Sequence, residues 1–309
     1  MRVIAVDGLT KRFDGKTVVD HISMHVEEGE IVGFLGPNGS GKTTTIRMIC
    51  GLLKPDDGTG TCLGYDIRKE SDRIKAEVGY MTQTFSFYED LTVRENLEFV
   101  ARLYRLRPQR AYVDAAVERL GMKNRQDQLA GELSGGWKQR LALAACVMHD
   151  PKLLLLDEPT AGVDPKARRE FWDEVHGLAA GGVTVLVSTH YMDEAERCHR
   201  IAYISNGRII AAGTVPEVVE RAGLSTWIVT GKGLGALAQE LRKQKGIDQV
   251  ATFGTTLHVV GADDEALRAA IAAFRDRPGV TWSKGETSLE DVFIQFMAGV
   301  KQPYLARGE

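Results

Sequence analysis

The chain has 309 residues, of which 43% are hydrophobic and 26% are charged, and this is the composition of an ordinary globular protein. Its 39 Lys and Arg residues against 42 Asp and Glu residues give a formal net charge of −3, which disfavours a basic surface for nucleic acid or anionic lipid. The strongest apolar runs, Leu141–Met148 and Leu153–Leu156, are far shorter than the roughly 18 residues of a membrane span, and the N-terminus lacks the apolar core of a signal peptide. The sequence therefore predicts a soluble chain of about two domains. Such a chain can still dock on a membrane partner.

The first part of the chain predicts strands separated by turns. Apolar runs predict strands at Arg2–Val6, Val18–Val26 and Ile31–Leu35, and the last run is apolar throughout, as a buried strand should be. A Gly-rich loop and a helix from about Lys42 to Cys50 follow, and Val78–Met81 predicts a further strand.

Helices are expected next. Thr92 and Glu95 have the spacing of a capping box. The helix that they open carries an apolar face formed by Leu97, Val100, Ala101 and Tyr104. Residues 108–149 also predict helix, with interruptions at Gly121 and near Gly131–Gly136.

Strands and helices then alternate, which implies a parallel sheet covered by helices. In chain order we expect a strand at Lys152–Leu156, a helix capped by Asp164 that runs to about Ala180, a strand at Val183–Ser188, a helix at about Met192–Arg197, and strands at Ile201–Ser205 and Arg208–Ala212. Asn206-Gly207 between the last two strands is a strong signal for a hairpin turn.

After Gly213 the pattern changes, and from about Ser225 we expect strand, helix, strand, strand, helix, strand and helix. The first six elements have the order of a split βαβ, ferredoxin-like unit. Residues 223–309 are therefore expected to form a small α+β domain of their own.

The four cysteines, Cys50, Cys62, Cys146 and Cys198, form no CxxC pair and are too sparse for a disulfide framework. We therefore expect reduced thiols and no structural metal site.

One Gly-rich loop predicts a phosphate site. It fits the P-loop pattern in full, with Gly36, Pro37, Asn38, Gly39, Ser40, Gly41, Lys42 and Thr43. It follows a buried strand and opens a helix, so backbone N–H groups and the positive helix end converge on phosphate oxygens. Lys42 would neutralise the β- and γ-phosphates, and Thr43 would offer its hydroxyl to Mg²⁺. The alternative is a chance match on a Gly-rich turn.

An apolar strand at Leu153–Leu156 ends in two carboxylates, Asp157 and Glu158. Ligands of α/β sheets lie at such strand ends. Asp157 is expected to hold Mg²⁺, and Glu158, one residue later, is expected to polarise the attacking water as a general base. The alternative is a pair that only ends the strand.

A second anion site is predicted at Ser134-Gly135-Gly136, which stands at the start of a helix. The alternative is an ordinary Ser N-cap. The P-loop already provides the binding site for one nucleotide. A second helix N-terminus that can bind phosphate therefore needs an explanation.

The order of these motifs carries a family resemblance. GPNGSGKTT, Gln83, LSGGWKQR, LLLLDEP, Ala161–Asp164 and His190, in this order, resemble the nucleotide-binding subunit of ABC transporters over about residues 2–220. The resemblance implies an α/β fold of the P-loop NTPase class, with a mixed-sheet core and a helical subdomain at about residues 84–150. The ATP-binding domain would comprise residues 1–222, and the ferredoxin-like domain residues 223–309.

The resemblance also implies roles for single residues. Phe13 would stack on adenine, unless it is only a core residue of its strand, and Thr44 would lie near the α-phosphate. Gln83 would sense Mg²⁺, take part in catalysis and meet the transmembrane subunit, and His190 would contact the γ-phosphate. Asp164 would lie in the loop between subunits, and it can cap its helix as well.

The implied assembly is a head-to-tail dimer with ATP and Mg²⁺. Ser134, Gly135 and Gly136 of one copy would close over the γ-phosphate held by the other, which explains the second anion site. Trp137 departs from the Gln or Met usual after the two glycines, and we expect it to pack against the partner.

The stretches Phe85–Leu106 and Ser288–Phe293 resemble ATPase subunits of drug, antibiotic or polysaccharide exporters. We therefore expect an ATPase on the cytoplasmic face of the membrane that drives export through a separate permease and binds no nucleic acid. The alternatives are an importer subunit and a cytosolic ABC ATPase acting on nucleic acid or ribosomes. The C-terminal domain, which has no catalytic constellation, is expected to serve assembly or regulation, or else to be a passive lid.

Overall fold

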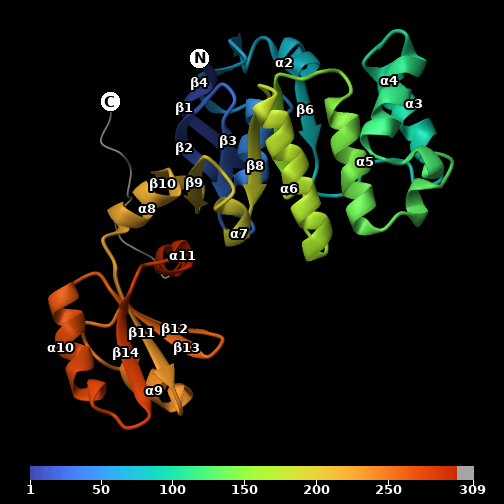
Figure 1. The fold of residues 1–309 in the computed structure, drawn as a ribbon. Coiled ribbons are helices and arrows are strands. Elements are labelled where there is room, and N and C mark those ends of the chain that lie inside the picture. Colours follow the sequence, from blue (N-terminus) through green and yellow to red (C-terminus); the bar gives the residue numbers. More distant parts are fainter. Residues whose placement is uncertain (298–309) are drawn as a thin grey trace. The chain divides into compact units, whose positions relative to one another are not determined.

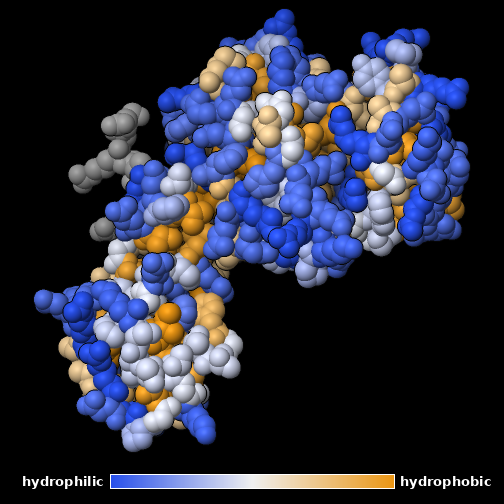
Figure 2. Space-filling view, in the orientation of Figure 1, coloured by the Kyte–Doolittle hydropathy of each residue, from blue (hydrophilic) through white to orange (hydrophobic). Residues whose placement is uncertain are grey.

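The computed structural model describes residues 1–297, which divide into two compact units, Met1–Ile209 and a second unit that begins at Ile210 (Figure 1). The domain boundary expected after residue 222 stays a prediction. Residues 298–309 of the expected C-terminal domain lie outside the described residues. The visible face of both units is largely hydrophilic, with apolar residues showing in smaller patches (Figure 2).

The first unit contains a four-stranded antiparallel sheet in the order β2-β1-β4-β5. Its strands are β1 (Arg2–Phe13), β2 (Lys16–Glu27), β4 (Asp57–Cys62) and β5 (Tyr65–Asp66). The buried residues of β1 and β2 do not alternate strictly, because the pairing of the two strands shifts register at several points.

The second sheet positions the chemistry. It has the order β10-β9-β3-β8-β7-β6, and the five strands from β9 to β6 pair in parallel with one another. Its strands are β3 (Ile31–Leu35), β6 (Val78–Met81), β7 (Leu153–Asp157), β8 (Thr184–Thr189), β9 (Arg200–Ser205) and β10 (Arg208–Gly213). Every residue of β3, β7 and β8 is buried, as the continuous apolar runs predict for strands covered on both faces. Leu35 pairs with Thr189 and Asp157 with Ser188, so these three strands end at one edge.

The helices of the first unit are α1 (Lys42–Ile49), α2 (Ser71–Glu77), α3 (Val93–Leu103), α4 (Gln109–Arg119), α5 (Gly135–Val147), α6 (Pro165–Ala180) and α7 (Met192–Ala195). Helices α3, α4 and α5 lie together at one side of the unit and share a core that includes Leu97, Val100, Val113, Val117, Leu120 and Leu141 (Figure 1). The predicted capping box is confirmed, because Thr92 accepts from the N–H of Glu95 and Glu95 accepts from the N–H of Thr92. No helix within residues 1–297 has both the length and the apolar character that crossing a bilayer requires.

The second unit is built on an antiparallel sheet in the order β12-β13-β11-β14. Its elements are α8 (Val215–Ala222), β11 (Ser225–Gly231), α9 (Leu234–Leu241), β12 (Gln249–Phe253), β13 (Thr256–Gly261), α10 (Asp264–Arg275), β14 (Val280–Gly285) and α11 (Leu289–Met297). From β11 onward the element order is the predicted one. The core includes Trp227, Val229, Leu237, Leu257, Val259 and Ile271.

Among the strands and α-helices of residues 1–297, four were not predicted: β4, β5, α2 and α8. Strand β4 reads Asp-Gly-Thr-Gly-Thr-Cys, and α2 buries only Ile74, so neither carries the apolar period that would reveal it. Helix α7 is shorter than expected and ends at Ala195.

Candidate active site

The phosphate loop connects β3 to α1 and depends on glycine. Gly36 and Gly41 have φ values of 152° and 106°, in the region that glycine favours. A Cβ atom on Gly36 would lie 2.1 Å from the carbonyl oxygen of Ile204, so no other residue fits there. Pro37, Asn38 and Gly39 are exposed at the tip of the loop. The loop therefore holds a fixed, open curve at the positive end of α1.

Ser40 and Lys42 are the buried polar groups of this loop. The Oγ atom of Ser40 is buried and makes no hydrogen bond, which leaves a hydroxyl free for a ligand. The Nζ atom of Lys42 donates to the carbonyl oxygens of Gly36 at 2.7 Å and Pro37 at 3.2 Å. It also lies 3.2 Å from Oε1 of Glu158. Three oxygen atoms, two from the loop and one from Glu158, thus surround the Lys42 ammonium at the mouth of the loop.

Asp157 lies at the end of β7 between two hydroxyl groups. Its Oδ1 atom accepts from Thr43 at 3.0 Å and from Ser188 at 2.6 Å. A hydroxyl and a carboxylate this close are the oxygen donors that Mg²⁺ prefers. The donor set therefore fits the cation that the motif implies.

Glu158 brings together the remaining predicted catalytic residues. Its backbone is left-handed, with φ of 47°, which is strained for a residue with a side chain. Its Oε2 atom accepts from Nε2 of Gln83 at 2.9 Å and lies 3.4 Å from Nδ1 of His190. The structure thus gathers Lys42, Gln83 and His190 around the carboxylate of Glu158. The four residues follow four different strands, β3, β6, β7 and β8.

Ser134, Gly135 and Gly136 open α5, and a Cβ atom on Gly136 would lie only 2.6 Å from Cβ of Ala167 in α6. Asp164 caps α6 by accepting from the N–H groups of Lys166 and Ala167. Within residues 1–297, no hydrogen bond or ion pair joins Ser134 or Asp164 to the phosphate loop. Both residues are exposed.

Trp137, which was expected to pack against the partner, packs within the chain. It contacts the core of α3, α4 and α5 and lies beneath the guanidinium groups of Arg125 and Arg140, at 5.7 Å and 4.7 Å from the ring centroid. Packing against a second subunit stays a prediction.

Phe13 lies at the end of β1 with 45% of its surface exposed, so it is not a core residue. The Nζ atom of Lys11 lies 5.6 Å from the ring centroid and is held by Asp56 at 2.8 Å. This hydrogen bond holds the pKa of Asp56 below its usual value. An exposed aromatic ring on a fixed strand can stack on a base. Thr44, in α1, is half-buried.

Sequence reasoning missed two groups at this edge. The Oγ atom of Ser188 donates to Asp157 and accepts from the N–H of Glu158 at 3.0 Å. Glu194 on α7 is buried and accepts from Thr160 and Thr189. Two hydroxyl residues directly before His190 at a strand end were the signal available for Ser188.

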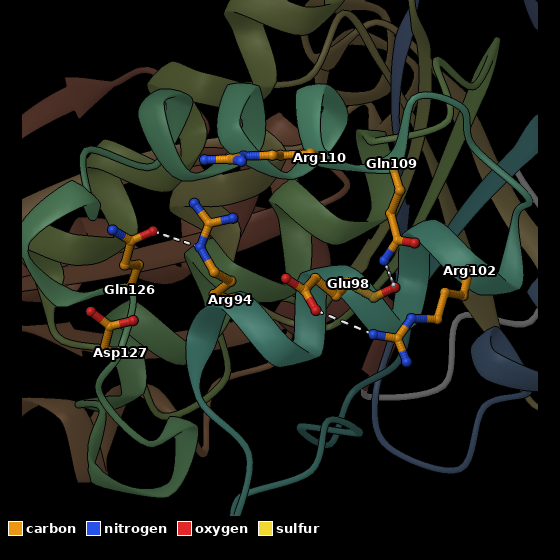
Figure 3. A pocket seen from close by; sticks show the side chains of 7 residues that line it. All are labelled: Arg94, Glu98, Arg102, Gln109, Arg110, Gln126 and Asp127. Atoms are coloured by element: carbon orange, nitrogen blue, oxygen red, sulfur yellow. Dashed lines mark hydrogen bonds and ion pairs between the residues drawn. The ribbon is translucent and has the colours of Figure 1, made fainter.

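A separate hollow of about 660 Å³ lies between α3 and α4 (Figure 3). It is lined by Arg94, Glu98, Arg102, Gln109, Arg110, Gln126 and Asp127. Arg94 already bonds Gln126 and Asp114, and Arg102 bonds Glu98. The hollow contains none of the predicted site residues.

A phosphate loop after β3, adjacent carboxylates at the end of β7 and a histidine after β8, all on neighbouring parallel strands, define a P-loop nucleoside triphosphatase. The family model described as ABC transporter matches residues 19–161. The chain is 38% identical over 301 residues to the Nod factor export ATP-binding protein I of Burkholderia orbicola, covering 96% of this chain and 97% of that protein. The chain therefore belongs to the ABC transporter family, and the predicted resemblance is confirmed.

Two further likenesses define the extent of the match. The chain is 47% identical over 218 residues to the probable multidrug ABC transporter ATP-binding protein YbhF of Escherichia coli, but the match covers 70% of this chain and only 38% of that protein. A solved ATP-binding cassette, a dimer in a post-hydrolysis state with ADP and Pi, has a TM-score of 0.62 and 25% identity, covering 68% of this chain and 98% of that one. The predicted ABC ATPase fold is confirmed, and it is the fold of an ATP-binding cassette.

Proposed function

We propose that the protein hydrolyses ATP and thereby drives export of a substrate through a separate integral-membrane permease, at the cytoplasmic face of the membrane. The observation that carries this proposal is the Glu158 carboxylate, which lies next to Asp157 and meets Lys42, Gln83 and His190. A carboxylate with an amide, an imidazole and an ammonium group around it supports a role in activating one water molecule.

The chain's own residues account for binding. The N–H groups of the phosphate loop and the Lys42 ammonium would bind the β- and γ-phosphates, and the Ser40 hydroxyl is free to join them. The exposed ring of Phe13 would stack on the adenine. A bound Mg²⁺, held by Thr43 and Asp157 with Gln83 nearby, would neutralise charge on the phosphates.

Glu158 and His190 account for the reaction. Glu158 would accept the proton of the attacking water, and Gln83 orients its carboxylate by donating to Oε2. His190, 3.4 Å from the same oxygen, would contact the γ-phosphate and hold the water between itself and Glu158.

We further propose that two copies work as a head-to-tail dimer. Ser134 and Asp164 are exposed, and within residues 1–297 no hydrogen bond or ion pair joins them to the phosphate loop, which suits groups that act on a second copy. The solved cassette with ADP and Pi is a dimer, which supports the proposal.

The proposed direction of transport is supported by the names of two relatives, a Nod factor export ATP-binding protein and a probable multidrug ABC transporter ATP-binding protein. The test is flux in inverted vesicles that hold the chain with its permease. ATP-dependent accumulation inside the vesicles supports export, ATP-dependent loss indicates import, and ATP hydrolysis stimulated by nucleic acid with no membrane partner indicates the third class.

A further inference from the structure

The carboxylate of Glu194, in the short helix α7, is fully buried although the proposed reaction does not use it. Its Oε1 atom accepts from the hydroxyl of Thr160, and its Oε2 atom accepts from the hydroxyl of Thr189 at 2.5 Å. Burying a carboxylate costs free energy unless the group is paired and hydrogen-bonded. A buried glutamate at this position therefore needs a structural or functional explanation.

The two hydroxyl groups come from the two loops that carry the reacting residues. Thr160 lies two residues after Glu158, in a turn where the N–H of Ala161 donates to the carbonyl oxygen of Glu158 at 3.2 Å. Thr189 directly precedes His190, and its hydroxyl also accepts from the N–H of Tyr191 at 3.0 Å. One carboxylate therefore bridges the loop of Glu158 and the loop of His190.

A third connection reaches α6, the helix capped by Asp164. The Nε atom of Arg168 lies 3.6 Å from Oε1 of Glu194. The same guanidinium lies 4.2 Å from the ring centroid of Tyr191, and that ring lies 4.1 Å from the ring of His190. The carboxylate thus shares an arginine with the ring beside His190.

A buried ion pair is weak evidence for stability, because apolar residues of the same volume often serve as well. A packed apolar side chain, however, cannot hold two hydroxyl groups at fixed positions, as this carboxylate does. We propose that Glu194 is a positioning residue that sets the 3.4 Å relation between Glu158 and His190, and so governs the hydrolytic step rather than nucleotide binding. This inference rests on the proposed ATP hydrolysis.

The test compares Glu194→Gln, Thr160→Val and Thr189→Val in the full chain assembled with its permease. Each variant removes one hydroxyl contact or the charge, and the valine variants keep the shape of threonine. We expect kcat to fall about 10- to 100-fold, as for small misplacements of reacting groups, with KM and the Kd for ATP changed less than about threefold. The double variant Glu194→Gln/Thr189→Val should lose little more than Glu194→Gln alone, because both act through one contact.

Two control variants distinguish an effect on the position of the reacting residues from an effect on the stability of the fold. Glu196→Gln changes an exposed carboxylate two residues away and should leave kcat unchanged. Val113→Ala lowers stability in the separate α4 core and should also leave kcat unchanged well below the melting temperature. If the test variants lose stability but keep wild-type kcat, as expected for Val113→Ala, or if KM rises with kcat unchanged, the inference is wrong.

A different result would contradict the proposed function itself. Hydrolysis that survives Glu158→Gln would overturn the assignment of the base. Wild-type hydrolysis that Glu158→Gln abolishes, together with wild-type kcat in both valine variants, would overturn only the role of Glu194. Should Glu194→Gln fail to fold, the two valine variants still decide the question.

Discussion

The Nζ atom of Lys42 lies 3.2 Å from Oε1 of Glu158, and both side chains are at least nine-tenths buried. The phosphate-binding cation and the proposed base are therefore direct neighbours, and neither can be changed without affecting the other. Removing the cation would leave a buried carboxylate, which is strongly destabilising. Removing the negative charge while keeping the shape is the milder change, because Lys42 keeps its two carbonyl partners.

Glu158→Gln should therefore fold and bind ATP while its turnover falls by roughly 10²-fold or more, the contribution of a positioned base. Phosphate release measures turnover, and equilibrium dialysis with ATP measures binding. The exposed Glu132→Gln is the matched control and should hydrolyse ATP normally. Near-normal turnover in Glu158→Gln would assign the base to another group.

Ser188→Ala tests the serine that sequence reasoning missed. It removes the 2.6 Å hydrogen bond to Asp157 and the acceptor for the N–H of Glu158, while that N–H keeps the carbonyl oxygen of Ser188 at 3.1 Å. We expect a loss of about 1–3 kcal/mol in the free energy of unfolding and a lower kcat. Urea unfolding and phosphate release measure the two effects. Ser283→Ala, at an exposed position, should change neither. Unchanged kcat with reduced stability would limit Ser188 to a structural role.

The dimer proposal can be tested by mixing two inactive variants. Ser134→Arg disables the Ser134-Gly135-Gly136 loop of one copy. In the other copy Lys42→Ala disables the phosphate loop, and it is combined with Glu158→Gln so that no unpaired carboxylate stays buried. Each mixed dimer combines both faults in one composite site and leaves the second site intact, so ATPase activity should partly return on mixing. Mixed dimers proven by affinity tags but without activity would contradict shared sites.

The two sheets differ in how far the sequence predicts them. Strands β3, β7 and β8 are continuous apolar runs that end in functional motifs, so both their existence and their common edge could be inferred. Strand β4 has no apolar pattern, because Gly60 lies so close to Ala5 of β1 that a Cβ atom would stand 2.7 Å from its carbonyl oxygen. That demand comes from tertiary packing, and no local period reveals it.

The same distinction applies to the site. Lys42, Asp157 and Glu158 belong to contiguous motifs, so their roles could be predicted from spacing and context. Glu194 lies in a run of polar residues within the helix expected at Met192–Arg197, and only the fold brings Thr160, 34 residues earlier, into contact with it. The carboxylate is functional in our proposal because of this long-range contact, and a sequence pattern carries no sign of it.

His149 gives a pH dependence to the stability of the α5 region. Its ring stacks on Tyr104 at 3.8 Å, and Nε2 lies 3.3 Å from the carbonyl oxygen of Val78. Burial lowers the pKa of His149 below its usual value, although the Val78 contact opposes the shift. The unfolded chain then binds more protons than the folded one as the pH falls below about 6.5, so folding stability should fall in that range.

His149→Phe keeps the stacking and removes the titration, so its stability should decline less than that of the wild type between about pH 6.5 and pH 5. Urea unfolding at several pH values measures the slope. His25→Gln, at an exposed position, should keep the wild-type slope. Equal slopes in His149→Phe and the wild type would show that other groups cause the dependence.

The last prediction concerns the C-terminal domain. Helix α11 packs on α8 and on β12, and it buries Val292, Phe293 and Phe296. A cut after residue 222 would therefore leave α8 without the helix that covers it, whereas a cut after Gly213 removes α8 as well.

We expect the chain cut after Gly213 to fold and bind ATP, because every predicted nucleotide contact precedes this residue. We also expect it to lose ATP-dependent dimerisation or coupling to the permease. The chain cut after residue 222 should bind ATP equally but aggregate more readily, because Val218 and Ala222 become exposed. Light scattering with ATP and transport in vesicles measure both variants. If the shorter chain dimerises and transports like the full one, the domain is only a lid, and if it folds without binding ATP, a nucleotide contact lies beyond Gly213.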